Sequence, residues 1–149
     1  GVVTVVFPAT EKEIVNIAAI PGVTVPVKGA TPVTTITETD QYTGTVTWND
    51  NPSTFAASTV YTATITLTAK AGYTLNGVAE NFFTVAGTTS DTSPINTGVI
   101  TAVFPKTLFE LTMVSVPAGS FQRDAEASNI SVITNSYSMS DHEITRDQY

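Results

Sequence analysis

The sequence has no cysteine, one histidine and few charged residues, and each of these shortages excludes a class of chemistry. Without cysteine the chain can form no disulfide framework, no thiolate zinc site and no thiol nucleophile. Its longest apolar runs, Val2–Pro8 and Ile17–Pro21, are far shorter than the ~20 residues of a membrane helix, so we expect no membrane insertion. The sequence also has no glycine-rich phosphate loop and no nucleophile elbow. We therefore expect no catalytic residue, no cofactor and no bound metal in this chain.

Positive charge is also scarce. Six lysine and arginine residues stand against 13 aspartate and glutamate residues, which gives a formal net charge of −7. Binding to nucleic acid or to an anionic membrane surface needs a basic patch that neutralises phosphates, so we expect no nucleic-acid partner. The sequence starts without Met, a basic segment or a cleavage site, which indicates a piece of a longer polypeptide that has already been targeted.

Threonine, by contrast, makes up about one residue in five. In Tyr42–Trp48 and Val60–Lys70 threonines alternate with other residues, most of them apolar or aromatic, which is the period of a half-buried strand. In the second of these stretches the threonines are predicted to face water. The residues predicted to face the core there are Tyr61, Ala63, Ile65, Leu67 and Ala69.

Turn signals divide the first two-thirds of the chain into about seven short strands, with no long helical period between them. This pattern predicts a mainly β fold, an antiparallel β-sandwich. Tyr73 follows an abrupt turn and is expected to bond its hydroxyl to the backbone across the two sheets. We expect a loop over Gly87–Thr97, and the other predicted strands are Glu13–Ile20, Val23–Val27, Val33–Glu38, Phe82–Ala86 and Gly98–Phe104.

Near copies of one phrase stand at both ends of this region. Gly1–Thr10 (GVVTVVFPAT) and Gly98–Thr107 (GVITAVFPKT) are offset by 98 − 1 = 97 residues and agree at seven of ten positions. A strand-like phrase repeated at the spacing of a domain indicates a tandem array of one module. We interpret residues 1–7 as the last strand of a preceding module, residues 8–107 as one complete module, and residues 108–149 as the start of a different domain.

Tyr42–Trp48, Val60–Tyr73 and Gly98–Pro105 resemble phrases of the tandem immunoglobulin-like repeats of bacterial cell-surface proteins. The resemblance covers about two-thirds of the chain and implies an immunoglobulin-like β-sandwich of about seven strands. In that family such repeats are commonly spacer or adhesive modules of secreted multidomain chains. The matching motifs are structural and identify no ligand.

The composition changes after Thr107, because both arginines, both methionines and the only histidine follow it. Thr145 is a plausible helix N-cap with Gln148 at the reciprocal position, so we expect a truncated α+β segment that ends in the first turn of a helix. The strands predicted before it are Phe109–Val116, Ser120–Arg123, Ile130–Asn135 and Tyr137–Ser140.

This tail resembles the opening of the formylglycine-generating, sulfatase-modifying-factor family. The matching positions are Met113, Val114, Pro117, Ala118, Gly119, Phe121, Glu143, Thr145 and Tyr149. The resemblance implies a fold related to C-type lectins, in a family that ranges from oxidases acting on a substrate cysteine to proteins that only bind. The family's catalytic cysteines lie downstream of this phrase, and Gln122 and Arg123 depart from its usual Met-Gly.

Four sites carry residue types found in functional sites, and in each case a structural interpretation is favoured. His142 lies between Asp141 and Glu143, but no second histidine or cysteine is available to share a metal. Asn49–Asn51 resembles a calcium loop but has one carboxylate, so a turn is favoured. Trp48 with Tyr42 could stack on a sugar but is expected in the core. Lys70 could crosslink to an asparagine, although a polar strand end does not suit that reaction.

Phe82 and Phe83 are adjacent, so a strand would place them on opposite faces, with one exposed or covered by the next repeat or the tail. For the chain as a whole we expect a non-catalytic, extracellular spacer or adhesion module of a multidomain bacterial surface or secreted protein. The alternative is an accessory repeat of a formylglycine-generating-type oxidase or of a lectin-like binding protein. The expected partners are a cell-surface glycan or protein, and self-association through Val2–Phe7 or residues 108–149.

Overall fold

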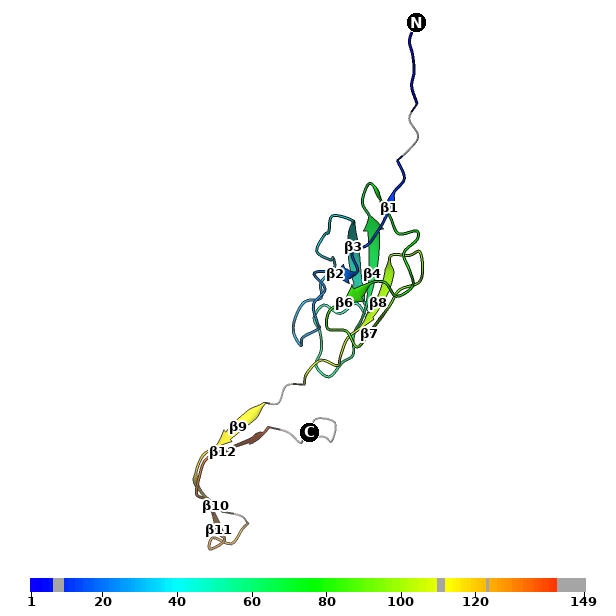
Figure 1. The fold of residues 1–149 in the computed structure, drawn as a ribbon. Helices are drawn as coiled ribbons and strands as arrows, with labels where there is room; N and C mark the ends of the chain where they lie inside the picture. The colour runs from blue at the N-terminus through cyan, green and yellow to red at the C-terminus, as the bar shows by residue number, and fades with distance from the viewer. Residues whose placement is uncertain (7–9, 110–111, 123, 142–149) are drawn as a thin grey trace. The chain divides into compact units, whose positions relative to one another are not determined.

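A computed structural model describes residues 1–6, 10–109, 112–122 and 124–141, and all of their regular structure is β (Figure 1). The prediction of a mainly β fold is therefore confirmed. The chain divides into two compact units, Gly1–Leu108 and Phe109–Tyr149.

The first unit is built on an antiparallel sheet of four strands, in the order β3-β4-β8-β7. These strands are β3 (Tyr42–Trp48), β4 (Thr62–Ala69), β8 (Val99–Val103) and β7 (Ser90–Thr92). In register, Ile65 of β4 lies opposite Val46 of β3 and opposite Ile100 of β8. Since all three are buried, the core side of the sheet has an apolar row across its three longest strands.

The faces of β4 are as its alternation predicts. Ala63, Ile65 and Leu67 are 0%, 0% and 5% exposed, whereas Thr64, Thr66 and Thr68 face solvent. Burying one apolar row and solvating one hydroxyl row fixes the register, because a slip by one residue would bury every threonine. The predicted strand at Tyr42–Trp48 is likewise confirmed.

The remaining strands of this unit differ from the prediction of a purely antiparallel arrangement. β1 (Glu13–Ile14) pairs in parallel with β5 (Tyr73–Thr74), and β2 (Ala19–Ile20) pairs in parallel with β6 (Thr84–Val85). The single strand predicted over Glu13–Ile20 is thus two strands of two residues each. The break between them has a cause, since the buried Gln41 side chain bonds to the backbone there: its Oε1 accepts from the amides of Asn16 (2.8 Å) and Ile17 (3.1 Å).

One apolar core joins the four-stranded sheet to the segments that carry β1, β2 and β6. The sheet contributes residues such as Ile65 and Ile100, and the other segments contribute residues such as Val15 and Val85. Aromatic rings meet within it, and Trp48 lies with its ring centroid 4.9 Å from that of Phe55. The fully buried members of largest volume are Tyr42, Phe83, Phe104, Ile65 and Ile100.

Three further predictions about strands are wrong. Val23–Val27 forms no strand: Pro26 has no N–H to donate, and Val25 and Val27 are exposed. The segment predicted over Val33–Glu38 is reduced to one bridge to β3, because the amide of Thr37 donates to the carbonyl of Pro21 instead of continuing the ladder.

The third wrong prediction is the loop over Gly87–Thr97, which contains strand β7. Its sequence, Ser-Asp-Thr, is polar on both faces, so it has no alternation to detect. It nevertheless completes the edge of the sheet by pairing with β8.

The second unit contains two antiparallel strand pairs in its described residues. β9 (Met113–Val116) pairs with β12 (Tyr137–Ser140), and β10 (Gly119–Gln122) pairs with β11 (Ile130–Ile133). Strands were predicted at all four places. β12 has the predicted bounds, β10 begins one residue before the predicted start at Ser120, and β11 ends two residues before the predicted end at Asn135. Apolar side chains of this unit remain exposed, among them Phe121 at 51% and Val132 at 66%. The helix start predicted at Thr145 lies outside the described residues.

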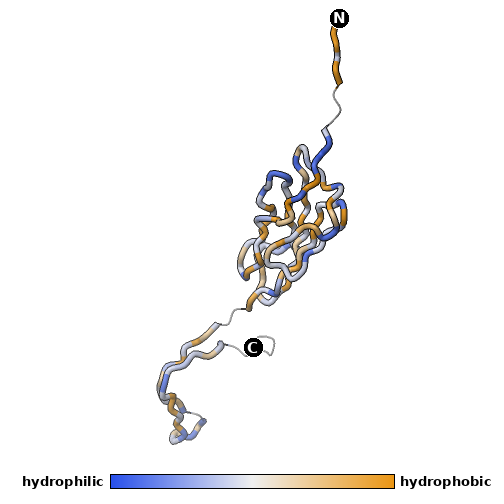
Figure 2. Tube along the Cα trace, in the orientation of Figure 1, coloured by the Kyte–Doolittle hydropathy of each residue, from blue (hydrophilic) through white to orange (hydrophobic). Residues whose placement is uncertain are grey.

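Residues 1–6 form no strand in the structure. They are nevertheless apolar, as Figure 2 shows, and Val2, Val3, Val5 and Val6 are exposed at 96%, 86%, 63% and 86%. The interpretation of residues 1–7 as the last strand of a preceding module stays a prediction.

Candidate functional site

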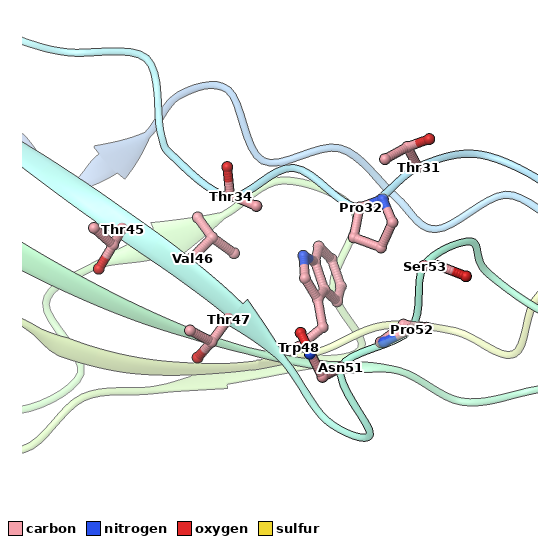
Figure 3. A pocket seen from close by; sticks show the side chains of 10 residues that line it. All are labelled: Thr31, Pro32, Thr34, Thr45, Val46, Thr47, Trp48, Asn51, Pro52 and Ser53. Atoms are coloured by element: carbon pink, nitrogen blue, oxygen red, sulfur yellow. The ribbon is translucent and has the colours of Figure 1, made fainter.

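The first unit has an open groove of about 430 Å³ beside β3 (Figure 3). Because β3 is an edge strand of the sheet, its outer side is paired only briefly, by the bridge between Thr35 and Thr45. The groove lies along the end of β3, between the segment that precedes this bridge and the turn that follows β3. Its lining residues are Thr31, Pro32, Thr34, Thr45, Val46, Thr47, Trp48, Asn51, Pro52 and Ser53.

Trp48 contributes to the groove but belongs to the core. Its side chain is only 7% exposed, and its ring packs against those of Phe55 and Phe104 at centroid distances of 4.9 and 5.4 Å. Its Nε1–H donates to the carbonyl oxygen of Val33 at 2.8 Å. A sugar-stacking platform needs an exposed ring face, so the core interpretation of Trp48 is the one that fits, and the same holds for Tyr42, which is 0% exposed.

The chemistry of the groove is neutral. Its lining consists of hydroxyl groups, two proline rings, Val46, one amide and the covered edge of Trp48, with no carboxylate and no cation among the lining residues. Such a surface can form hydrogen bonds to a neutral polar ligand but supplies no general acid, base or nucleophile pair. Of the lining residues, Trp48 and Asn51 were candidates from the sequence, and the others were not predicted.

The Asn49–Asn51 loop is a turn whose polar groups bond to one another. Asp50 and Asn51 have φ values of 59° and 45°, in the left-handed region that Asn and Asp adopt more readily than other side chains. The Asn49 Oδ1 accepts from the amide of Thr62 at 2.7 Å, and its Nδ2 donates to the Asp50 carboxylate at 2.7 Å. These oxygens therefore serve the turn between β3 and the strand that follows.

Lys70 is a surface residue. Its Nζ lies 2.8 Å from Oε1 of Glu38, and the two side chains are 31% and 68% exposed. A crosslinking lysine needs an apolar setting with a buried acid, and this pair has neither. An exposed ion pair of this kind stabilises the fold by at most ~1 kcal/mol.

Tyr42 is fully buried in the core of the first unit. Burial raises the pKa of its hydroxyl above the ordinary value of 10.0. The hydroxyl lies within donating distance of two carbonyl oxygens, that of Ile17 (3.2 Å), within the break between β1 and β2, and that of Ala19 (3.0 Å), the first residue of β2. This is the kind of bond across the core that was expected of Tyr73, which is half-buried against the core.

Phe82 and Phe83 do not lie on opposite faces of a strand, because both precede β6. Phe83 is 1% exposed, and Phe82 packs against the same core with its ring centroid 5.2 Å from that of Phe83. The premise that the two rings lie on opposite faces is therefore wrong, and the hypothesis that a neighbouring repeat or the tail covers one of them stays a prediction.

Two further features concern metal and membrane. His142 and Glu143 lie outside the described residues, so the histidine site is not placed. Within the described ranges, no three His, Asp or Glu side chains gather as metal ligands would. None of the described residues belongs to a helix that could span a bilayer.

Comparison of the chain with models of protein families, with curated proteins and with solved structures found no match.

Proposed function

We propose that residues 8–107 form a non-catalytic, immunoglobulin-like β-sandwich that serves as a spacer or adhesion module on the outside of a bacterial cell. In this proposal the four-stranded sheet is one layer of the sandwich. The two short parallel pairs, β1–β5 and β2–β6, mark the second layer, and the shared core lies between them.

The observation that supports a tandem spacer is the position of the phrase Gly98–Thr107. It forms β8 and continues to Thr107, whose Oγ1 donates to the carbonyl oxygen of Ala56 at 2.7 Å and accepts from the amide of Thr59 at 3.0 Å. The phrase thus closes the module and ties its end to the body. A near copy at Gly1–Thr10 is what the joint to another module of this kind would contain.

The joint between two such modules would be short. Thr10 occupies the position that corresponds to Thr107, and the first backbone hydrogen bond of β1 is donated by Glu13 to the carbonyl of Gly72 at 2.8 Å. Only Glu11 and Lys12 lie between these two attachment points. A linker of two residues allows little bending, which suits a spacer that holds other domains at a fixed distance.

Small-angle scattering tests the spacer role on a chain in which residues 11–107 are duplicated. We expect the maximum dimension to grow by about 25–40 Å, since β4 alone spans roughly 23 Å and its turns extend it. A joint that bends freely would instead give a broad distribution of dimensions and contradict the proposal. An array of glycans and matrix proteins, probed with the full chain, separates adhesion from a purely mechanical role.

A second candidate concerns the domain that begins after residue 108. The positions that resemble the sulfatase-modifying-factor opening, from Met113 to Phe121, lie on β9, the following turn and β10, whose apolar side chains are exposed. Exposed strand faces of this kind are covered when the rest of a domain packs on them. We therefore retain the alternative that the module carries an oxidase-type or lectin-like domain. A downstream cysteine pair in the parent polypeptide would favour the oxidase.

A further inference from the structure

Strand β8 occupies a position in the sheet, called the β8 slot, that must be filled for the module to fold. It lies in the interior of the four-stranded sheet, between β4 and β7. The phrase that contains it contributes Ile100, Ala102 and Phe104, which are 0%, 0% and 1% exposed. Without this strand, the edges of β4 and β7 that pair with it would be unpaired and the core would have a gap.

The N-terminal segment has the residues that this slot selects, beginning with glycine. A Cβ on Gly98 would lie 2.7 Å from Cδ1 of Leu75 and 2.9 Å from Cβ of Leu67, so no other residue fits there without a shift of its neighbours. Gly1 is the matching residue of the N-terminal segment.

The same match is found at the other end of the phrase. Thr107 is 4% exposed as a whole residue. Its hydroxyl donates to the carbonyl oxygen of Ala56 and accepts from the amide of Thr59. Thr10 is its counterpart. The two phrases thus share a glycine where a side chain has no room and a threonine where the hydroxyl is buried. We take this as a sign that both phrases fit the β8 slot, and not merely that both form similar strands.

The two core positions that differ between the phrases remain apolar. Val3 corresponds to Ile100 and is one methylene smaller, and Val5 corresponds to Ala102 and is two carbons larger. In this chain Val3 and Val5 are 86% and 63% exposed. Their counterparts Ile100 and Ala102 are fully buried. The N-terminal segment therefore has apolar side chains at the positions that face the core in β8, but here they are exposed.

The segment cannot reach the slot of its own module. With Thr10 in the place of Thr107, it would stand near Thr59, before the start of β4, whereas Glu13 is bonded to Gly72, beyond the end of β4. The eight residues of β4 separate these ends by about 23 Å. Three residue steps from Thr10 to Glu13 span at most about 11 Å.

We propose that Gly1–Thr10 is a donor strand that completes the β8 slot of another module of this same fold, in the register of Gly98–Thr107. In a tandem array that partner is the module upstream, and between separate chains it is a second copy whose slot is open. The inference rests on the tandem-module part of the proposed function. Beyond that proposal, it specifies the partner of the N-terminal segment (another module of this fold), the place that the segment fills (the β8 slot) and the direction of association (head to tail).

Two full-length chains test strand donation. In the first, Ile100→Asp, Ala102→Asp and Phe104→Asp disable β8. In the second, Val3→Asp and Val5→Asp are added. The emission of Trp48, the only tryptophan, reports whether the core has formed, since its ring lies 5.4 Å from that of Phe104. Sedimentation velocity reports assembly.

We expect the first chain to form oligomers with a native-like, blue-shifted Trp48 emission, and the second to remain monomeric with the red-shifted emission of an unfolded chain. Assembly without native-like emission, assembly that survives Val3→Asp and Val5→Asp, or no assembly at all would overturn the proposal. A folded monomer of the first chain would also overturn it, because the slot would then not need these side chains.

A graft tests the same correspondence without disabling β8. The variant Ile100→Val, Ala102→Val, Lys106→Ala gives Gly98–Thr107 the sequence of Gly1–Thr10 within an intact chain. If the two phrases fit the same slot, the variant folds and its melting temperature falls by less than about 15 °C. Loss of the unfolding transition would refute the correspondence. The scattering test of the duplicated chain does not depend on donation between chains, so the spacer role and the donor strand can fail separately.

Discussion

Truncation of Phe104 gives the sharpest test of how the module is closed. The residue follows β8, is 1% exposed, and its ring lies against that of Trp48 at a centroid distance of 5.4 Å. Its amide also donates to the carbonyl oxygen of Tyr61 at 2.9 Å, which aligns the end of the phrase with the start of β4. Phe104→Ala keeps that backbone bond and removes only the ring.

The expected cost is large for a module of this size. Removing a fully buried phenylalanine ring destabilises a protein by about 3–5 kcal/mol, and the ring contact with Trp48 places the cost in the upper part of that range. A domain of about a hundred residues has roughly 5–15 kcal/mol of total stability, so the loss is a major share of it. With an m-value of about 1–1.5 kcal/mol per molar urea, the unfolding midpoint falls by roughly 3–5 M.

Equilibrium unfolding in urea, followed by Trp48 emission, measures this directly. Phe121→Ala is the matched control, because Phe121 is 51% exposed and lies on β10 of the second unit. We expect the control to leave the Trp48 midpoint within about 0.5 M of the wild type. Equal shifts for the two variants, or a shift below about 0.5 M for Phe104→Ala, would refute the assignment of Phe104 to a self-sufficient core.

Three further predictions concern single polar groups in the first unit. Burial raises the folded-state pKa of Tyr42 above 10.0, so the contribution of its neutral hydroxyl to stability is complete below pH 10.0 and is lost as the pH rises through the folded-state pKa. In an alkaline titration followed by circular dichroism, Tyr42→Phe should therefore unfold at a higher pH than the wild type. Identical curves for the two proteins would contradict this linkage. Gln41→Ala leaves the amide of Asn16 unpaired and should cost about 1–3 kcal/mol in urea unfolding, with no loss counting against the role of Gln41 at the break. Ser93 has a buried hydroxyl with no hydrogen-bond partner among the described residues, so Ser93→Ala should raise the melting temperature by a few degrees, and a lower melting temperature would show that the hydroxyl is bonded.

The strands that could be predicted from the sequence are those with a strong contrast between their faces. β3 and β4 alternate between hydroxyl and apolar side chains, and this contrast gave their positions and, for β4, its buried face. The strands of the second unit were located in the same way, from short apolar runs bounded by turn residues. Local pattern is sufficient where one face is buried and the other is wet.

The rest depends on partners that are distant in the sequence. β7 reads as a loop because its hydrogen bonds to β8 do not require apolar side chains. The break between β1 and β2 is made by Gln41, some 25 residues away, through bonds that no local propensity encodes. The groove beside β3 was not predicted for the same reason. Its walls come from two turns that are separate in the sequence, so no local pattern indicates it.

Hydrogen exchange on the full chain tests the central claim, that Gly98–Thr107 closes a module which is complete without the second unit. The amides of Leu67, Phe104 and Thr107 donate to Gly98, Tyr61 and Thr59 within the first unit. The account predicts that they exchange together, at the slow rate of the global unfolding of β3 and β4, while peptides from 112–141 exchange independently. Exchange of Phe104 and Thr107 at the rate of the 112–141 peptides, with Leu67 still protected, would contradict it.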